Sequence, residues 1–562
     1  MNWEAAPTPD QKRVKDLQEA LGVSKTIGEL LVQRAIDSYA RAKTFFRPQW
    51  EDLHDPFLML GMEKAVQRID RALTENQSIM VYGDYDVDGT TSVALMTTYL
   101  KQKGGRITPY IPDRYTEGYG ISYQGIDHAL ANGIQLIIAL DCGVKAIDKV
   151  AYAKEKGLDF IVCDHHLPGE ELPDTVALLN PKQPHCSYPF KELCGCGIGF
   201  KLLQGLTHFW KEDPTAIVSY LDLVATATAA DIVPMVGENR VLCFFGLKQI
   251  RENSRPGIKR LLGALKRPAT ISDLVFRVAP RINAAGRMDH ALTAVQLLMT
   301  EDQEALAQIA DQIEHFNSER RSIEKRITEE ALQQLAQSKE HSPSATVVYA
   351  DHWHKGVVGI VAARLIETHY RPTIVLTRSG DQYVGSVRSV KGFDVYAALV
   401  ASAKHLVQFG GHKYAAGLTL DHQQLDAFKA AFDQAVSAAI TPDQLEPKAR
   451  YDTALPLDAI DDKLYRIVEQ MAPFGPQNMR PIFYSENCID SGASCRVGKD
   501  QTHLKISIQT PNGPIAGIGF GLADYYPAIA SGRPFDVLYT LDENEWNGQR
   551  SLQLKIKHLR LK

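Results

Sequence analysis

Between residues 77 and 181 the chain alternates five short, almost purely apolar runs with longer stretches of helical character. A strand that is apolar along its whole length is buried on both faces, which is typical of parallel sheets covered by helices on both sides. The sequence therefore predicts an α/β unit with a parallel sheet. Its strands are expected at Ser78–Gly83 and in ITPYIP (107–112), LIIALD (136–141), FIVCDHH (160–166) and TVALLNP (175–181).

Three aspartates alternate directly after the first predicted strand, at Asp84, Asp86 and Asp88. Like charges this close repel one another, and burying them costs free energy unless a cation offsets them. Asp141 and Asp164 follow two further strands, and ligands of parallel sheets bind beyond the carboxyl ends of the strands. We therefore expect these carboxylates to meet at one edge of the sheet.

His165, His166 and Asp231 extend this set of polar side chains. Oxygen ligands with one or two imidazoles suit Mn²⁺ or Mg²⁺, and one or two such ions are expected. Two cations held by shared aspartates would stabilise both the attacking and the leaving oxygen of a phosphoryl displacement. For a single aspartate, a helix cap is the commoner role. For the whole set at one sheet edge, a cation site is the better explanation.

The rest of the chain divides into further units. A helical region is expected over residues 1–50, and helices from about Phe200 complete a first lobe over 51–302. A polar helix is predicted next, within 303–344. Its narrow apolar stripe, broken at Arg320, suits a helix that bridges two lobes.

Residues 345–440 alternate strands and helices again, which predicts a second, smaller α/β lobe. Residues 450–562 are rich in alternating strands, with a hairpin signal at Asn547–Gly548, and a small β-barrel is expected there. Phe474, Phe483 and Tyr484 are candidates for stacking on bases, although core packing is the safer interpretation for each.

Composition excludes few classes of function. A chain of 562 residues is too long for one core, and its net charge of -5 hides any local patch that would contact phosphates. No apolar run has the length of a membrane span, and the N-terminus lacks the pattern of a signal peptide, so we expect a cytoplasmic protein without membrane contact.

A weak zinc pattern is formed by His185, Cys186, Cys194 and Cys196, and structural thiols are the better explanation.

Four stretches resemble, in order, the motifs of the DHH phosphoesterase superfamily: GDYDVDGTTS (83–92), ALDCGV (139–144), VCDHHLPG (162–169) and ATAADIVP (227–234). Five more narrow the resemblance to the RecJ family of single-strand-specific 5′→3′ DNA exonucleases: RINAAGR (281–287), HWHKGVVGIVAARL (352–365), GSVRS (385–389), FGGHKYAAG (409–417) and MAPFGPQNMRPIF (471–483). The resemblance covers Ser78 to about Phe483. It implies a DHH catalytic lobe, a DHHA1-like substrate-binding lobe and an OB-like tail that binds nucleic acid, acting in DNA repair and recombination.

The resemblance also implies roles for individual residues. It makes metal ligands of Asp86, Asp88, Asp141, His165 and Asp231, with Asp141 bridging two cations. Asp84, Asp164 and His166 would act beside them in catalysis. Related pyrophosphatases have a histidine where this chain has Tyr82, a poor ligand for Mg²⁺, so one metal position is expected to be weaker.

On the substrate side, two glycines, Gly410 and Gly411, precede His412 and would let backbone N–H groups approach a phosphate. A plain glycine-rich turn is a comparable explanation, and the resemblance favours phosphate binding. The other phosphate-binding candidates are Arg281, Arg287, Arg388 and Ser389. The resemblance implies single-stranded DNA as substrate, a monomer, and a single-strand-binding protein and a helicase as partners.

Two other functions compete with an exonuclease. A phosphodiesterase for very short RNAs or cyclic dinucleotides would resemble the two lobes alone, and the extra strand-rich tail argues for a long polymer. A non-catalytic DNA-binding scaffold would have lost metal ligands, whereas the carboxylate and histidine set is complete here. Residue spacing alone does not indicate cleavage polarity.

Overall fold

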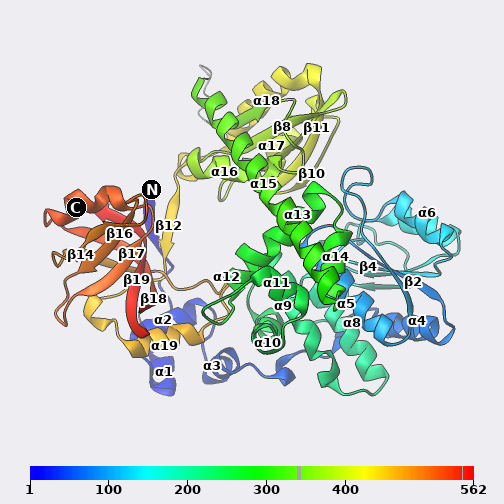
Figure 1. Ribbon diagram of the computed structural model, residues 1–562, viewed down its shortest axis with the longest axis horizontal. Coiled ribbons are helices and arrows are strands. Elements are labelled where there is room, and N and C mark those ends of the chain that lie inside the picture. Colours follow the sequence, from blue (N-terminus) through cyan, green and yellow to red (C-terminus); the bar gives the residue numbers. More distant parts are fainter. Residues whose placement is uncertain (338–343, 547) are drawn as a thin grey trace.

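The computed structural model describes residues 1–337, 344–546 and 548–562. Figure 1 shows two α/β lobes joined by one long helix, with a strand-rich unit beside them that carries both termini. The predicted mixed α/β architecture is confirmed.

The first lobe contains a sheet of five parallel strands in the order β3-β2-β4-β5-β6. From β2 the chain first moves outward to β3 and then returns to the other side at β4. The loops after β2 and β4 therefore leave the sheet in opposite directions, which places the switch point of the topology, where ligands of such sheets bind, between these two strands. All five predicted strands are present: β2 (Ser78–Gly83), β3 (Arg106–Tyr110), β4 (Leu136–Leu140), β5 (Asp159–Cys163) and β6 (Ala177–Leu179).

Helices bury both faces of this sheet, as its apolar strands require. Ile79 and Val81 of β2 face a core shared with α4 (Met62–Thr74), α5 (Val87–Gln102) and α8 (Gly195–Phe209). Met80 and Tyr82 face a second core with α6 (Tyr123–Ala131) and α7 (Ile147–Glu155). Helices complete the lobe: α9 (Leu221–Ala230), α10 (Gly237–Asn253), α11 (Pro256–Leu262), α12 (Ile271–Asp273), α13 (Ala279–Met288) and α14 (Leu292–Met299).

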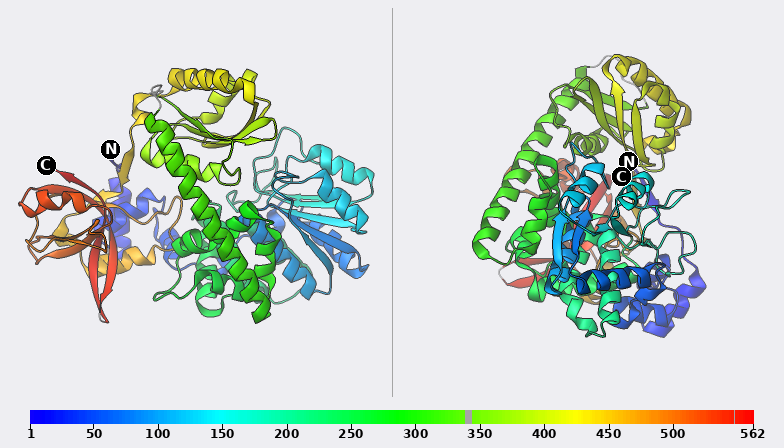
Figure 2. Two further views of the ribbon diagram at one scale, coloured as in Figure 1. Left: turned by 45° about the horizontal axis from the view of Figure 1, so that its top comes forward. Right: turned by 90° about the vertical axis from the view of Figure 1, so that its right-hand side faces the viewer.

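The long helix α15 (Gln303–Gln337) runs from the first lobe to the second, as both views in Figure 2 show. Its first half packs Leu306 and Ile313 into the core of the first lobe, and its second half packs Ile327 against the second. This confirms the predicted bridging helix as far as Gln337, and the last predicted residues of this helix lie outside the described residues. Buried polar residues, Asn317, Arg320 and Glu324, occupy the stretch between the two cores.

The second lobe has a mixed sheet in the order β10-β11-β9-β8-β7. Only β7 and β8 are parallel, and the other pairs are antiparallel. The strands are β7 (Thr346–Tyr349), β8 (Thr373–Ser379), β9 (Gln382–Arg388), β10 (Gln408–His412) and β11 (Ala415–Asp421). The helices are α16 (Val358–Thr368), α17 (Val395–Ala401) and α18 (Leu425–Ala439).

The tail forms a seven-stranded sheet in the order β13-β14-β18-β19-β17-β16-β15. Its strands are β13 (Thr453–Ala454), β14 (Phe483–Cys488), β15 (Cys495–Val497), β16 (His503–Ile508), β17 (Ile515–Gly519), β18 (Phe535–Trp546) and β19 (Gln549–Leu561). The predicted hairpin joins β18 to β19, which pair antiparallel. Asn547 of its turn lies outside the described residues.

The N-terminal region packs against the tail rather than standing alone. Strand β1 (Asn2–Ala5) pairs in parallel with β12 (Lys448–Tyr451). Helices α1 (Gln11–Leu21), α2 (Lys25–Gln33) and α3 (Tyr39–Phe46) share one hydrophobic core with the tail strands and with α19 (Asp462–Gln470). Among the described residues, no helix has the length and apolar character needed to cross a membrane.

Candidate functional site

The turn from β2 into α5 carries the three alternating aspartates. Asp86 caps α5 by accepting a hydrogen bond from the Gly89 N–H (3.1 Å), which is why the helix begins at Val87. A Cβ on Gly89 would lie 2.3 Å from the Asp84 carbonyl oxygen, so only glycine permits this tight turn. The turn buries Asp84 and Asp88 almost completely.

The N-terminus of α8 holds the Asp88 carboxylate. The N–H groups of Gly195 and Cys196 donate to its two oxygens at 2.6 and 2.7 Å. A helix N-terminus favours negative charge, so these bonds fix the carboxylate's orientation and support its ionised form. A Cβ on Gly195 would lie 2.5 Å from the Asp141 Cβ, so a glycine is needed here for the two carboxylates to approach.

His165 lies at the centre of a group of carboxylates. Its Nε2 lies 3.1 Å from Asp141 Oδ1, 3.7 Å from Asp231 Oδ2 and 3.9 Å from Asp88 Oδ2. Asp141 follows β4 in the left-handed conformation, with φ of 61°, and Asp231 ends α9. The structure thus brings together side chains that follow β4, β5 and α9 with the first turn of α5.

Burial and the crowding of like charges shift the pKa values of the side chains in this cluster. Burial, followed by the neighbouring carboxylates, raises the pKa of Asp231 to about 8 and that of Asp88 to about 6, and raises that of Asp141 well above its ordinary value. Burial and the adjacent His166 lower the pKa of His165 to about 3, so His165 is neutral near pH 7 and its lone pair is available.

These residues fit a hard divalent cation. The ligand atoms of Asp88, His165 and Asp231 lie within 4.8 Å of one another, as do those of Asp141, His165 and His166. Asp231 Oδ2 is buried and has no hydrogen-bond partner among the described residues. Carboxylate oxygens with one neutral imidazole suit Mn²⁺ or Mg²⁺, and a cation would lower the raised pKa values of the carboxylates.

Asp164 organises the loop that carries the two histidines. One oxygen accepts from the backbone N–H groups of His165 and His166 and contacts His166 Nδ1 at 2.7 Å, and the other accepts from the Val144 N–H. Burial opposes the charge on both groups, yet the pair and its hydrogen bonds lower the pKa of Asp164 and raise that of His166. The Tyr119 hydroxyl lies 3.2 Å from His166 Nε2.

Tyr82 does not point at the cluster. Its side chain is buried on the face of β2 that also carries Met80. There its hydroxyl donates to the Gly120 carbonyl (2.9 Å) and accepts from the Ser122 N–H. The expected weakness of one metal position therefore stays a prediction based on the missing histidine.

Arg114, Arg287 and Arg388 gather, with Arg320 near them, where the first lobe meets the second. Burial and the charges of Arg114, Arg388 and Arg320 lower the pKa of Arg287 to about 10. Arg287 donates to the Gly356 carbonyl and Arg388 to Ser386 Oγ, both at 2.8 Å. Among the described residues, Arg114, Arg287 and Arg388 have no carboxylate ion-pair partner, so their charges remain available for an anion.

Arg114 is not among the residues predicted from the sequence. It lies in the loop after β3, where its guanidinium stacks 4.1 Å over the Tyr85 ring. Its position beyond the carboxyl end of a predicted strand was the one feature of the sequence that could have identified it.

The other predicted phosphate-binding residues have different surroundings. Arg281 is paired with Glu314 of α15 at 2.6 Å, so its charge is already balanced. Ser389 Oγ donates to the Phe393 carbonyl. Gly410, Gly411 and His412 lie on the edge strand β10, exposed to solvent, and their role stays a prediction.

Packing explains two sets of weaker candidates from the sequence, the aromatic residues of the tail and the cysteines. Phe483 is fully buried in the tail core, and Phe474 and Tyr484 are partly buried, under Arg480 and beside Tyr451. Cys194 and Cys196 are buried free thiols, and neither joins a ligand cluster of the described residues.

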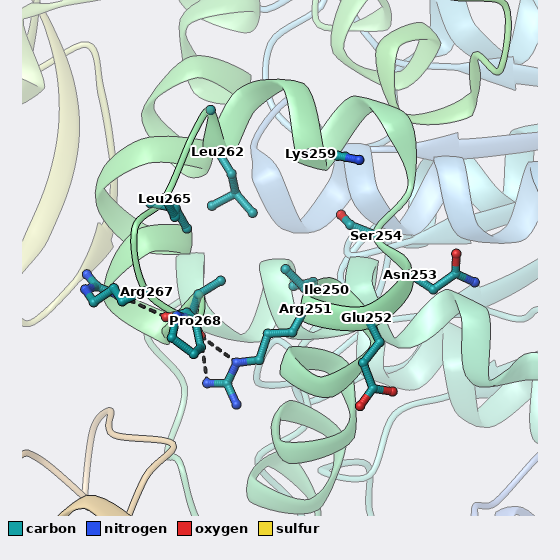
Figure 3. Close-up of a pocket in the computed structure, with 12 residues that line it drawn as sticks. Ile250, Arg251, Glu252, Asn253, Ser254, Lys259, Leu262, Leu265, Arg267 and Pro268 are labelled. Carbon is teal, nitrogen blue, oxygen red and sulfur yellow. Dashed lines mark hydrogen bonds between the residues drawn. The ribbon is translucent and has the colours of Figure 1, made fainter. Parts of the chain in front are cut away.

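The hollow in Figure 3 lies between the end of α10 and α11 and contains none of the predicted site residues. Arg251 at its edge donates Nε and Nη2 to the Ala269 carbonyl, and Arg267 pairs with Asp273 at 2.7 Å. The hollow brings together no group of predicted site residues, and we assign it no role.

Comparison with known proteins accounts for this arrangement. Residues 78–228 match the DHH family N-terminal domain, 342–438 the DHHA1 domain and 451–558 the RecJ OB domain. The single-stranded-DNA-specific exonuclease RecJ of Bacillus subtilis is 36% identical over 562 residues, covering 99% of this chain and 70% of that protein. The chain belongs to the RecJ family. The RecJ of Escherichia coli K12 is 34% identical over 523 residues, covering 89% of this chain and 90% of its own.

A solved RecJ structure has the same fold throughout. The RecJ of Thermus thermophilus in complex with Mn²⁺ superposes with a TM-score of 0.85 at 26% identity, covering 100% of this chain and 79% of that one. The RecJ-family resemblance inferred from the motifs is confirmed, as is its OB-type tail. This chain is thus a phosphodiester hydrolase of the DHH class, and Mn²⁺ or Mg²⁺ fits its carboxylate cluster.

Proposed function

We propose that this chain removes nucleotides from single-stranded DNA in the 5′→3′ direction, with Mn²⁺ or Mg²⁺ bound by Asp86, Asp88, Asp141, His165 and Asp231. The observation that carries this proposal is the approach of three carboxylates to within 3.1–3.9 Å of one buried, neutral imidazole nitrogen. Such crowding is costly without a cation. When bound, the cation supplies Lewis acidity and activates water for attack on the phosphodiester.

The protein side chains divide the remaining tasks. The Gly195 and Cys196 N–H groups hold Asp88 in one orientation. Asp141, whose Oδ1 lies 3.1 Å from His165 Nε2, is proposed as the ligand that two ions share. Asp164 holds His166 and favours its protonated form, so that Nε2 donates a hydrogen bond to an oxygen of the scissile phosphate. Asp84, fully buried directly after β2, is proposed to act beside these ligands.

The arginine cluster supports cleavage that starts from a phosphorylated end of the strand. Arg114, Arg287 and Arg388 leave positive charge at the junction of the lobes, beside the first-lobe site, and a terminal 5′-phosphate carries more negative charge than an internal phosphodiester. His412, with Gly410 and Gly411, is proposed to contact the phosphate from the second lobe, Ser389 to assist there, and Arg281 to join after its pair with Glu314 opens.

The wider setting is inferred from the family resemblance. We propose that the chain acts in the cytoplasm as a monomer, in DNA repair and recombination, together with a single-strand-binding protein and a helicase. The proposed functional units are 51–302 for catalysis, 303–344 as connector, 345–440 for substrate binding and 450–562 for holding the strand, with 1–50 supporting the tail.

Digestion of end-labelled DNA tests the activity. With Mn²⁺, a 5′-labelled single strand should release labelled mononucleotide at once, while a 3′-labelled strand should shorten step by step. Duplex DNA and chelator-treated protein should give neither. Asp141→Asn should lower kcat by at least about 100-fold, because a shared ligand is lost. Asp127→Asn, which changes an exposed carboxylate bound by the Tyr152 hydroxyl, is the matched control. Label released first from the 3′ end would refute the polarity, and a fully active Asp141→Asn would refute the metal site.

A further inference from the structure

The residue after Asp231 has a backbone conformation that its side chain opposes. Ile232 has φ of 59°, and its side chain is 69% exposed. A β-branched residue in the left-handed region is an outlier, whereas glycine or asparagine adopts this conformation at little cost. Because either would make the same turn after α9, the turn does not explain an exposed isoleucine beside a proposed metal ligand.

The loop that carries Ile232 leads from the metal-site candidate towards the tail. The Met235 N–H donates to the Pro476 carbonyl at 2.8 Å. A Cβ on Gly475 would lie 3.0 Å from the Met235 Cβ, so the two loops are in close contact. The residues after Asp231 thus join the catalytic lobe to the segment that precedes β14.

That segment is tightly hydrogen-bonded, yet it exposes an apolar side chain. Asn478 Nδ2 donates to the carbonyls of Met471 and Pro473, and Asn478 and Gly475 exchange backbone hydrogen bonds. The next residue, Met479, is 64% exposed. The loop is therefore built to hold Met479 in one place without burying it.

We propose that Ile232 and Met479 form an apolar track that packs against the bases of the single strand between the metal-site candidate and the tail. Each residue lies three positions from the Met235–Pro476 hydrogen bond, and three residues span at most about 11 Å. The faces of all bases are apolar, so such contacts hold a strand without reading its sequence. In a duplex, stacking covers those faces, so the track would favour single strands. The proposal rests on the proposed function for the path of the strand.

Abasic substrates test the track directly. One single-stranded sequence is prepared with one abasic nucleotide, moved position by position from the 5′ end, and kcat/KM is measured with the Mn²⁺-loaded full chain. Ile232→Gly and Ile232→Asn suit the left-handed turn, and Met479→Ala alters an exposed side chain. Phe209→Ala is the matched control, because this exposed aromatic lies about 21 Å along α8 from Gly195.

On an intact strand we expect both Ile232 variants and Met479→Ala to lower kcat/KM about fivefold, through KM, with Phe209→Ala unchanged. Each loss should vanish when the abasic nucleotide occupies one particular position, and that position should lie further from the 5′ end for Met479 than for Ile232. The unfolding temperature of Ile232→Gly should equal or exceed that of the unaltered chain. A loss that is the same for every abasic position, or no loss in any variant, would overturn the track.

Binding measured without turnover separates this proposal from the proposed function. Fluorescence anisotropy in chelator, with the same abasic series, should show the same position-dependent loss of affinity. If the unaltered chain digests no DNA but this pattern appears, the activity assignment fails and the track stands. If digestion proceeds and the pattern is absent from both assays, the track fails and the activity stands.

Discussion

Asp88 and Asp231 set the pH dependence that we expect for metal binding. Their pKa values are raised to about 6 and about 8, chiefly by burial and then by neighbouring carboxylates. At pH 7 the metal-free site therefore retains a proton that a cation must displace. The affinity for Mn²⁺ should rise steadily from pH 5 to pH 8. Calorimetric titrations at pH 7, in buffers of different ionisation enthalpy, should detect the released proton. An affinity that stays constant over this range would contradict the assignment.

The same shifts link folding to pH in the metal-free protein. Above the ordinary aspartate pKa of 3.8, the unfolded chain has lost a proton that folded Asp231 keeps until about pH 8. The folded state then binds more protons than the unfolded state, so this contribution to stability falls as pH rises through that window. Bound Mn²⁺ offsets the repulsion. The difference in unfolding temperature between Mn²⁺-loaded and chelated protein should therefore widen from pH 5 to pH 8.

The carboxylates of the site were predictable because each follows a strongly apolar segment of recognisable type. The arginines of the site were less predictable. Arg287 and Arg388 were identified through motifs, whereas Arg114 lies in a polar loop without periodicity. Its meeting with the other two depends on how the lobes pack, and sequence periodicity carries no information about that.

Among the secondary-structure elements, α15 shows how an interrupted stripe reflects packing. Its apolar residues pack into one lobe and then the other, and between them Arg320 donates to Asn317 Oδ1 and Glu324 Oε2 at 2.6 and 2.5 Å. Arg364 of α16 donates to the other Glu324 oxygen at 3.0 Å. The break at Arg320 in the sequence therefore marks the boundary between the two cores.

We expect Glu324→Gln to destabilise the protein by about 2–3 kcal/mol, because it leaves the largely buried Arg320 without its counter-charge. Glu329→Gln is the matched control. Glu329 faces Lys325 on the exposed side of the same helix, so its loss should cost less than about 0.5 kcal/mol. Chemical denaturation followed by circular dichroism measures both. Equal effects would mean that the network adds nothing beyond a surface pair.

The individual strands and the bridging helix were predictable from period and composition, because each is a local pattern. Pairing between distant segments was not. Strand β1 joins β12 across more than four hundred residues, and the N-terminal helices complete the core of the tail. Those helices have an ordinary amphipathic pattern, and this pattern does not indicate which surface they pack against.

At the scale of the whole molecule, Arg240 of α10 connects the first lobe to two segments that are distant in the sequence. Its buried guanidinium donates to the carbonyls of Phe45, Met471, Ala472 and Pro473, which belong to the N-terminal region and to the start of the tail. A truncation after Ile440 would therefore remove partners of Arg240 and expose Leu17, Ile27 and Leu30 of the N-terminal helices. The tail's contribution to strand binding is better tested by changes at its surface.

The tail presents one exposed aromatic ring beside a cation. Phe520 is 58% exposed, lies edge-on to His503 at 5.2 Å between ring centroids, and has Lys555 Nζ 5.9 Å from its own centroid. An aromatic face next to a positive charge suits a stacked base and its phosphate. We expect Phe520→Ala to weaken binding of long single strands by about 1–3 kcal/mol. Lys555→Ala should lower the slope of log affinity against log salt by about 1, because one fewer counterion is released.

Strand length separates binding at the tail from binding at the metal-site candidate. Oligonucleotides too short to reach the tail should bind both variants and the unaltered chain equally, and Phe209→Ala should leave strands of every length unaffected. Anisotropy titrations with short and long strands at several salt concentrations provide the comparison. If long strands bind the Phe520 and Lys555 variants with unchanged affinity and salt slope, this face of the tail does not carry DNA. The seven-stranded sheet would then serve only to complete the core that it shares with the N-terminal helices.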